Sequence, residues 1–276
     1  MNTRLHTLID EALLFLNRAD HPARLMNPRG FYVAFSGGKD SQVLLDLVRR
    51  SGLPHEVHHN VTTIDAADNI RFIRQHYPDV IFDRPDTSFL RLVASKGLPT
   101  TNRRWCCDLF KEVKGYGFVV LAGVRAEESV KRSRYNEVNI WQKSRDKRVM
   151  KSLGEMEQVH FECIKGKDKL LMYPLLRWKE SDIWDYIHGF DLPVNPCYHD
   201  RGRVGCMVCP FCNSKMIRKY LDDNPKYKSL LVRALDENIK LHGESVFENG
   251  NDLLNWWLSH KTIAEYMADK RQLSLF

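Results

Sequence analysis

Six consecutive residues near the start of the chain have the composition of a phosphate-binding turn: Ser36, Gly37, Gly38, Lys39, Asp40 and Ser41. Glycines let the backbone approach an anion without side-chain clashes, and the start of a following helix supplies N–H donors and a positive dipole end. Lys39 adds positive charge, and the carboxylate of Asp40 suits either Mg²⁺ or a helix cap. The spacing differs from the G-x-x-x-x-G-K-[ST] loop of ATPases and from the G-x-G-x-x-G dinucleotide turn. The turn therefore indicates a phosphate ligand.

Cysteines form a second group that could do chemistry. The chain has seven: Cys106, Cys107, Cys163, Cys197, Cys206, Cys209 and Cys212. In a cytosolic protein, clustered cysteines favour metal or redox chemistry over disulfides. The C-x-x-C-x-x-C spacing from residue 206 lets one loop present three thiolates to an iron–sulfur cluster, with Cys197 or Cys106 as the fourth ligand. Four thiolates also bind Zn²⁺, which stays an alternative. Cys163 is expected to be a small buried hydrophobic residue.

The elements that must position the glycine turn alternate between strands and helices. Apolar runs predict strands at 31–35, 55–63, 79–85 and 117–122, and helical periodicity predicts helices at 41–50 and 66–78 between them. Such alternation predicts an α/β fold with a doubly wound, mainly parallel sheet. Ligands of these sheets bind outside the carboxyl ends of the strands, where the glycine turn and A-G-V-R at 122–125 both fall.

The second half of the chain is less regular. Residues 126–170 are charged and lack periodicity, so loops are expected there. Residues 179–190 predict a short amphipathic helix capped by Ser181, and the pattern beyond residue 213 is helical. We predict a nucleotide-binding domain at 1–190, followed at 191–276 by the cysteine loop and a helical C-terminal region.

Composition and charge narrow the class of protein. The chain of 276 residues has an ordinary apolar share of 43% and no window near the roughly 18–20 apolar residues of a membrane span. Its first twenty residues predict an amphipathic helix rather than a signal peptide, so a cytoplasmic protein with no membrane partner is expected. The formal net charge is +7, and residues 125–151 hold nine Lys and Arg against four acidic residues. A polyanionic partner or a solvated basic loop would explain that excess.

Several segments together resemble a known family. F-S-G-G-K-D-S at 35–41 resembles the PP-loop of the N-type ATP pyrophosphatases, which cleave ATP between the α- and β-phosphates and transfer AMP to a substrate oxygen. The branch that includes the phosphoadenosine phosphosulfate (PAPS) reductases is similar at W-C-C-D-L-F-K (105–111), A-G-V-R-A-E-E-S-V-K-R (122–132) and P-L-L-R-W-K-E-S-D-I-W-D-Y-I (174–187). The cysteine segment from 197 to 210 is similar as well. The resemblance implies the adenine-nucleotide alpha-hydrolase-like fold.

The resemblance also implies roles for individual residues. Residues 36–41 would hold ATP phosphates with Mg²⁺, and Lys39, Asp40 and Arg125 would act in catalysis. Further residues would line the nucleotide pocket: Thr62, Thr63, Asp65, Glu128, Ser129 and Arg132. Two structural alternatives stay open, in which Glu128 pairs with Arg132 and Asp65 caps the next helix.

For the cysteines, the resemblance supports two ligand sets for a [4Fe-4S] cluster. The ATP pyrophosphatase component of DNA phosphorothioation systems has a C-x8-C-x2-C pattern, which nominates Cys197, Cys206 and Cys209, completed by Cys212. Assimilatory reductases pair an adjacent Cys-Cys with C-x-x-C, which nominates Cys106, Cys107, Cys206 and Cys209. The first set is preferred because its members are local in sequence.

The resemblance leads to one main functional hypothesis and three alternatives. ATP would adenylate a DNA phosphate oxygen, and sulfur from a cysteine desulfurase or another donor would then displace AMP. The alternatives are a PAPS or adenylyl-sulfate reductase, an RNA thiolation enzyme, and a non-catalytic nucleotide-binding redox regulator. No cysteine follows Cys212, whereas the reductases use a cysteine in a C-terminal E-C-G motif, so the reductase is disfavoured. A homodimer is an open expectation.

The last five residues, Q-L-S-L-F at 272–276, suggest another partner. They resemble the peptide with which bacterial proteins dock on the replicative sliding clamp. The alternative is the end of a helix that packs on the core. Clamp docking would bring the protein to DNA.

Overall fold

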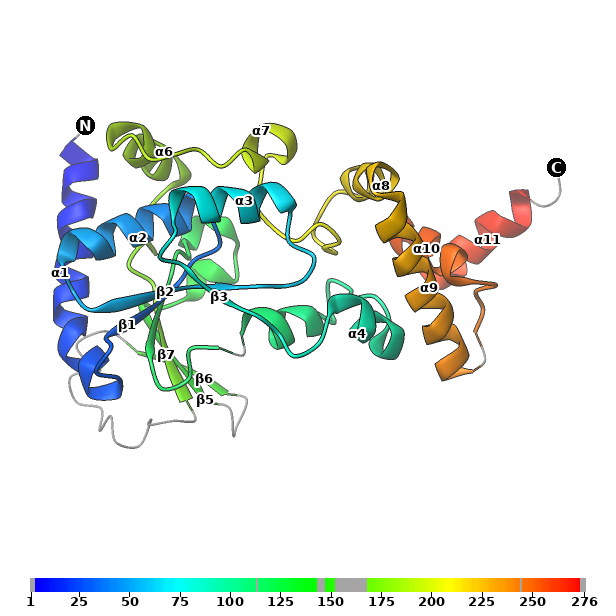
Figure 1. The fold of residues 1–276 in the computed structure, drawn as a ribbon, viewed down its shortest axis with the longest axis horizontal. Helices are drawn as coiled ribbons and strands as arrows, with labels where there is room; N and C mark the ends of the chain where they lie inside the picture. The colour runs from blue at the N-terminus through cyan, green and yellow to red at the C-terminus, as the bar shows by residue number, and fades with distance from the viewer. Residues whose placement is uncertain (1–2, 113, 143–146, 152–167, 244, 274–276) are drawn as a thin grey trace. The chain divides into compact units, whose positions relative to one another are not determined.

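A computed structural model describes residues 3–112, 114–142, 147–151, 168–243 and 245–273. The chain forms two compact units (Figure 1). The sheet unit comprises residues 1–60, 66–83 and 113–204, and the helical unit comprises residues 61–65, 84–112 and 205–276. The domain boundary after residue 190 stays a prediction. The two compact units divide the chain at other points. The cysteine segment itself is shared between them.

The sheet unit is built on a mixed sheet with the strand order β3-β2-β1-β4-β7-β5-β6. The strands are β1 (Phe31–Ala34), β2 (His55–Asn60), β3 (Ile81–Asp83), β4 (Val119–Ala122), β5 (Val138–Gln142), β6 (Lys147–Lys151) and β7 (Asp168–Met172). The first five strands in this order pair in parallel, and Val33 of β1 lies level with Val57 of β2 and Leu121 of β4. The predicted α/β class with a mainly parallel sheet is confirmed.

Strands also occur between residues 126 and 170, where loops were expected. That expectation is wrong for β5, β6 and β7, in which β5 pairs antiparallel with both of its neighbours. In β7, Lys169 lies between buried Leu170 and the polar start of the strand, and its Nζ donates to the carbonyl of Lys114 at 3.1 Å. A buried lysine lowers the mean hydropathy of a core strand, but it is tolerated when its ammonium group is hydrogen-bonded. The local hydropathy of this segment therefore did not predict a strand.

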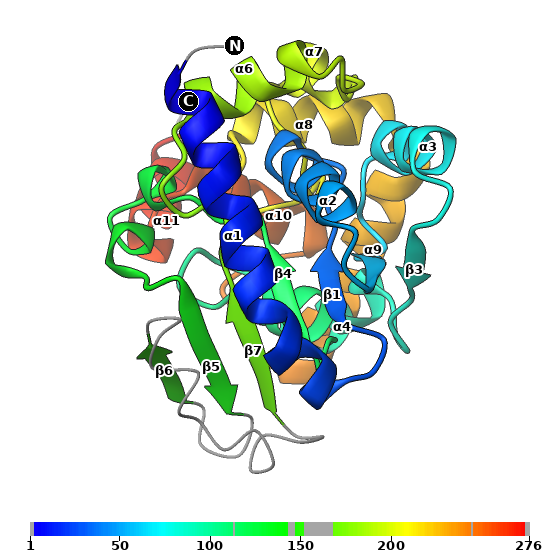
Figure 2. The same ribbon diagram turned by 90° about the vertical axis from the view of Figure 1, so that its left-hand side faces the viewer.

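One face of the sheet shares its apolar core with four helices (Figure 2). These are α1 (Thr3–Met26), α2 (Lys39–Ser51), α3 (Ala67–His76) and α6 (Glu180–Gly189). The predicted amphipathic N-terminal helix is confirmed by its buried stripe of Leu5, Leu8, Ile9, Ala12 and Leu16. Helices α1, α2 and α6 pack against one another. The contacts with α1 and α6 hold α2 in position, and the glycine turn lies at the start of α2.

Helix α6 begins differently from the prediction. Its N-cap is Lys179, whose N–H donates to the Asp182 carboxylate at 2.8 Å, so Ser181 is not the cap. Arg4 of α1 donates to both oxygens of the same carboxylate, at 3.0 and 2.9 Å. A carboxylate in the first turn accepts a hydrogen bond from a free N–H, and its negative charge interacts favourably with the positive end of the helix dipole. The neutral hydroxyl of Ser181 lacks that charge.

The helical unit contains α4 (Phe89–Lys96), a π-turn η1 (Cys107–Lys111), α8 (Ser214–Asp223), α9 (Pro225–His242), α10 (Gly250–Ser259) and α11 (Ile263–Leu273). Helix α4 packs on α9, and the core includes Phe89, Leu231 and Leu254. The predicted helical C-terminal region is confirmed. Within the described residues, no helix combines the length and the apolarity needed to cross a bilayer.

Candidate functional site

The glycine turn joins the carboxyl end of β1 to the first residue of α2, as its sequence predicted. Gly37 has φ +77°, in the left-handed region that favours glycine. A Cβ atom on Gly37 would lie 2.3 Å from Oδ1 of Asn69, so the position is also too crowded for a side chain. Gly38 is the N-cap of α2 and has no side-chain cap bond. The Gly38 N–H donates to Ser36 Oγ at 3.2 Å and the Lys39 N–H donates to Tyr198 Oη at 2.8 Å, so side-chain hydroxyls lie where a phosphate would bind.

Buried side-chain amides hold the carbonyl groups of the turn. Asn69 Nδ2 donates to the carbonyl of Ser36 at 3.0 Å, and Asn195 Nδ2 donates to the carbonyl of Gly37 at 2.9 Å. Gln42 Nε2 donates to the same Gly37 oxygen at 3.3 Å. Because a trans peptide is planar, fixing each carbonyl on one side directs the following N–H to the other side. The turn is thus shaped before any ligand binds.

Two cationic side chains lie beside the turn. Nζ of Lys39 is 3.4 Å from Oδ2 of Asp40 and 3.3 Å from Oε1 of Glu180. The side chain of Arg125 is only 4% exposed, and its Nε donates to Oδ1 of Asp40 at 2.6 Å while Nη1 donates to Glu127 at 2.9 Å. Both cations are balanced by carboxylates, so an incoming polyphosphate would exchange these partners for its own oxygens.

Gly123 brings Arg125 to this position. The segment that follows β4 passes close to the first turn of α2, and a Cβ atom on Gly123 would lie 2.9 Å from backbone atoms of Asp40. The glycine therefore permits the close approach of A-G-V-R to the turn. The predicted proximity of Arg125 to residues 36–41 is confirmed.

Glu128, Ser129 and Arg132 shape the turn that follows Arg125. Glu128 accepts from the Arg125 N–H at 2.9 Å and forms an ion pair with Arg132, and Ser129 Oγ accepts from the Arg132 N–H at 3.2 Å. The ion pair between Glu128 and Arg132, which was the structural alternative for Glu128, is therefore present. A direct contact between these residues and nucleotide stays a prediction.

Thr62, Thr63 and Asp65 belong to the helical unit. Asp65 accepts from the N–H and the hydroxyl of Thr62 at 2.7 and 2.8 Å, and Thr63 Oγ1 accepts from the Phe89 N–H at 2.8 Å. Asp65 does not cap α3, whose N-cap is Ala66. These residues order their own turn and the start of α4, and their contact with adenine and ribose stays a prediction.

The preferred cysteine set is divided between the two units. Cys197 is buried in the short helix α7 (Cys197–Arg201) of the sheet unit, where its N–H donates to Asn195 Oδ1 at 3.0 Å. Cys206, Cys209 and Cys212 lie in the helical unit with Cys106 and Cys107. Cys163 lies outside the described residues. No group of three or more His, Cys, Asp or Glu side chains in the described ranges has the arrangement of a metal site.

Electrostatics link the members of the alternative set. A hydrogen bond from Cys106, together with the charges of Lys111 and Arg104, lowers the pKa of Cys107 to about 7. Burial raises the pKa of Cys206, and the negative charges of Cys206, Cys107 and Cys209 raise the pKa of Lys111. The negative charges of Cys107, Cys206 and Cys209 thus act on both Cys106 and the exposed Lys111.

Two buried donors near these thiols lack acceptors. Trp105 Nε1 and Tyr227 Oη have no hydrogen-bond partner among the residues that the structure describes. Both side chains pack in the apolar cluster that includes Cys106, Cys206 and Cys212. Buried polar groups are normally satisfied, and cluster sulfur or thiolate could accept from both donors. The donor chemistry therefore fits a thiolate-bound metal or cluster.

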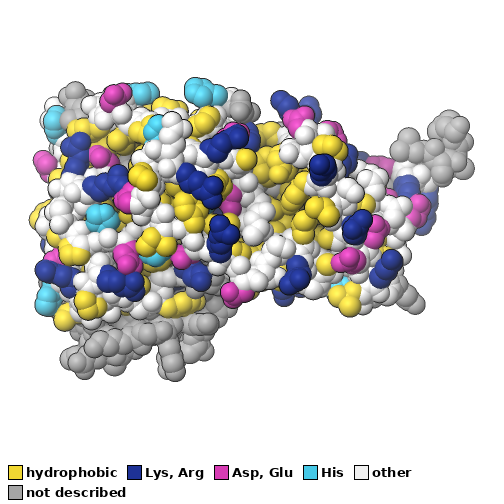
Figure 3. Space-filling view, in the orientation of Figure 1, with side chains coloured by type: hydrophobic (Ala, Val, Ile, Leu, Met, Phe, Trp, Pro, Cys, Tyr) yellow, Lys and Arg dark blue, Asp and Glu magenta, His cyan; other side chains and the backbone are white. Residues whose placement is uncertain are grey.

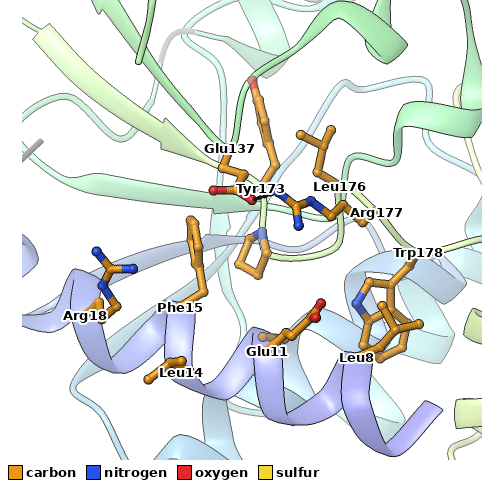
Figure 4. Close-up of a pocket in the computed structure, with 12 residues that line it drawn as sticks. Leu8, Glu11, Leu14, Phe15, Arg18, Glu137, Tyr173, Leu176, Arg177 and Trp178 are labelled. Carbon is orange, nitrogen blue, oxygen red and sulfur yellow. Dashed lines mark ion pairs between the residues drawn. The ribbon is translucent and has the colours of Figure 1, made fainter. Parts of the chain in front are cut away.

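A separate pocket of about 240 Å³ lies between α1 and the segment that follows β7 (Figure 4). Leu8, Phe15 and Trp178 supply apolar walls, and Arg177 forms a 3.0 Å ion pair with Glu137 at its edge. None of the predicted site residues lines it. It is distinct from the turn at 36–41.

On the face shown in Figure 3, Lys and Arg side chains are interleaved with acidic and uncharged ones. Of the basic stretch at 125–151, Arg125 and Arg132 are paired, Lys143 and Arg145 lie outside the described residues, and the side chains at 147–151 are not described. Its contact with DNA stays a prediction. At the C-terminus, α11 ends at residue 273 and residues 274–276 lie outside the described chain, so clamp docking also stays a prediction.

Comparison with known protein families shows to which family the chain belongs. The family model of the phosphoadenosine phosphosulfate reductase domain matches residues 30–212, which include the glycine turn, Arg125 and the cysteine segment. The chain belongs to this family. Membership of this family is consistent with an enzyme that uses ATP or another nucleotide. It also confirms the PP-loop superfamily that the sequence indicated.

Individual relatives are distant. An uncharacterised protein of Methanocaldococcus jannaschii is 25% identical over 249 residues, which cover 83% of this chain and 46% of that protein. An adenosine 5'-phosphosulfate reductase of Staphylococcus haemolyticus is 28% identical, covering 63% of this chain and 68% of the reductase. A PAPS reductase structure from Candida auris covers 75% of this chain and 96% of its own, with 16% identity and a TM-score of 0.45. The chain thus spans less than half the length of the archaeal relative.

Sequence reasoning missed the side chains that shape the turn: Gln42, Asn69, Asn195 and Tyr198. Asn69 and Asn195 are 4% and 0% exposed, and Asn195 Nδ2 also donates to Asn69 Oδ1 at 2.7 Å. An asparagine before Pro196, just upstream of the cysteine segment, was the available signal, because a buried amide in a turn usually satisfies backbone groups.

Replacing Asn195 by alanine is expected to lower the free energy of unfolding by about 2–3 kcal/mol, because it leaves the Gly37 carbonyl and the Cys197 N–H with fewer partners inside the protein. Urea denaturation measures the change. Asn17→Ala is the matched control, since Asn17 makes one exposed bond to the Leu13 carbonyl and should cost less than about 1 kcal/mol. Equal losses in the two variants would contradict the role assigned to Asn195.

Proposed function

We propose that the protein is an ATP pyrophosphatase that adenylates a substrate oxygen for sulfur transfer, with a DNA phosphate as the leading acceptor. The observation that carries the proposal is the preformed turn at 36–41 with Lys39 and the buried Arg125 beside it. The N-terminus of α2 and two cations form a site for a polyphosphate. Family membership and the resemblance to PP-loop enzymes support ATP as that polyphosphate.

The reaction is a displacement at the α-phosphorus of ATP. The acceptor oxygen forms a bond to that phosphorus, the bond to the bridging oxygen breaks, and pyrophosphate leaves with the electron pair. Lys39 and Arg125 would offset the charge on the leaving group, and bound Mg²⁺ would supply further charge neutralisation. Sulfur from a desulfurase or another donor would then form a bond to the phosphorus of the acceptor, and AMP would leave with the activated oxygen.

The test of the acceptor uses DNA directly. Anaerobically purified protein is incubated with Mg-ATP, duplex DNA and a cysteine desulfurase with cysteine, and the DNA is digested and analysed for phosphorothioate linkages by mass spectrometry. The proposal expects linkages that require ATP, and a Lys39→Ala variant should form none. Pyrophosphate release without sulfur in DNA would contradict DNA as the acceptor and leave the RNA alternative.

A second function, reduction of adenylyl sulfate, is favoured by a specific observation. Cys106, Cys107, Cys206 and Cys209 belong to one unit and match the adjacent Cys-Cys and C-x-x-C of the assimilatory reductases, and a reductase is among the relatives. Sulfite production from adenosine 5'-phosphosulfate with thioredoxin would support this function. Pyrophosphate release from ATP would support the first.

Metal content separates the two ligand sets. We propose that Cys106, Cys107, Cys206 and Cys209 hold the metal or [4Fe-4S] cluster, because their thiols influence one another in one unit. Cys106→Ser is expected to lose roughly half or more of the bound iron or zinc, whereas Cys197→Ser should keep it. Elemental analysis of anaerobically purified variants measures this. The opposite pattern would support Cys197, Cys206, Cys209 and Cys212.

A further inference from the structure

Tyr198 is held against the glycine turn by a rigid set of contacts. It lies in α7, directly after the segment in which Asn195 bonds to Gly37, and the Tyr198 N–H donates to the Asn195 carbonyl at 3.0 Å. Trp184 of α6 packs edge-on against its ring at 5.4 Å between centroids. The ring is therefore held by its backbone hydrogen bond and by Trp184.

The phenol oxygen lies at the phosphate-binding face of the turn. The N–H of Lys39, the first residue of α2, donates to Tyr198 Oη at 2.8 Å. A Cβ atom on Gly38 would lie 3.2 Å from the same oxygen. Nζ of Lys39 lies 5.6 Å from the centre of the tyrosine ring. The hydroxyl thus meets a free donor of the helix N-terminus and lies near the ammonium group.

The hydroxyl has a proton to give. It accepts from Lys39, and among the hydrogen bonds formed within the described ranges none uses the Tyr198 proton. Burial raises the pKa of Tyr198 to about 12, so the phenol stays protonated near neutral pH. A phenol can accept from an amide and donate to an anion at the same time.

We propose that the Tyr198 hydroxyl donates a hydrogen bond to a phosphate oxygen of the nucleotide bound at residues 36–41. The inference rests on the proposed function, since it assigns one more ligand to the same phosphate site. Lys39 Nζ and Tyr198 Oη then both face the phosphate, while the Lys39 N–H donates to the phenol oxygen. The competing arrangement is a plug, in which Tyr198 occupies the phosphate position and must leave before ATP binds.

The two arrangements predict opposite effects of Tyr198→Phe, which removes the hydroxyl and keeps the ring on Trp184. Affinity for Mg-ATP and for inorganic pyrophosphate is measured by isothermal titration calorimetry. A lost donor to an anion weakens binding of both probes by roughly tenfold or more. The loss should be constant between about pH 6 and 9, because the phenol does not ionise there.

Tyr186→Phe is the matched control. Its buried hydroxyl donates to Asp46 at 2.6 Å and makes no contact with residues 36–41 in the hydrogen bonds described. Affinity within about twofold of wild type is expected for this control, even where its stability falls. Urea denaturation of both variants separates loss of folded protein from loss of affinity.

Tighter binding by Tyr198→Phe would support the plug and overturn the proposal, as would unchanged binding. Pyrophosphate release from ATP is followed in the same wild-type preparation. If wild type binds both probes but releases no pyrophosphate, the proposed function fails, while a tenfold effect of Tyr198→Phe on binding still supports the phosphate ligand. If wild type binds neither probe, both proposals are contradicted.

Discussion

Replacing Lys39 by alanine is expected to lower the rate of pyrophosphate release about 100- to 1,000-fold while the protein stays folded. The Lys39 side chain is only 12% exposed, and its Nζ lies 3.3–3.4 Å from Asp40 and Glu180. A preorganised cation in such a site acts on the charge that develops on the leaving group, and one lost donor typically costs this factor in turnover. Steady-state pyrophosphate release measures the effect, with circular dichroism confirming the fold.

Lys179→Ala is the control for Lys39→Ala. Lys179 is exposed at the N-cap of α6, next in sequence to Glu180, so its loss removes the same charge from nearby without removing a contact of the turn. Activity within about threefold of wild type is expected. A Lys39→Ala variant with full activity would favour the non-catalytic nucleotide-binding regulator.

Replacing Arg125 by methionine is expected to lower the free energy of unfolding by about 3 kcal/mol. The arginine is buried, and its loss leaves the Asp40 carboxylate, 18% exposed, with Lys39 as its remaining ion-pair partner among the described residues. Breaking one partner of a buried ion pair usually costs about 3–5 kcal/mol, and the surviving contact with Lys39 places the expected loss at the lower end. Urea denaturation at neutral pH measures it.

Arg177→Met removes a comparable pair from the surface. Arg177 is 72% exposed and lies 3.0 Å from Glu137, so less than about 1 kcal/mol should be lost. If Arg125→Met costs no more than Arg177→Met, the buried pair does not hold the turn. In that case any effect of Arg125→Met on activity would report on its contact with the nucleotide and not on the stability of the turn.

The sequence predicted the parts of the fold that local patterns encode. Apolar runs and helical periodicity located β1, α2, β2, α3, β3 and β4, and the two glycines located the turn. Strand β7 was missed because Lys169 interrupts its apolar pattern, although its ammonium group is satisfied by a carbonyl 55 residues away. A contact over that sequence distance leaves no trace in local hydropathy.

The candidate site was predictable in its charged residues and not in its supporting ones. Lys39, Asp40 and Arg125 carry a motif and meet as expected. Asn195 and Tyr198 reach the turn from more than 150 residues away in sequence. The cysteines show the same limit, since Cys197 is near Cys206 in sequence yet belongs to the other unit, and Cys106 joins Cys206 and Cys209.

The products formed from ATP test cleavage between the α- and β-phosphates most directly. Anaerobically purified wild-type protein is incubated with Mg-ATP, with and without DNA, and its phosphorus-31 NMR spectrum is followed over time. We predict that wild-type protein forms pyrophosphate, with AMP released or attached to an acceptor in equal amount, and that Lys39→Ala forms neither. Formation of ADP and inorganic phosphate, or no turnover with or without DNA, would contradict cleavage between the α- and β-phosphates.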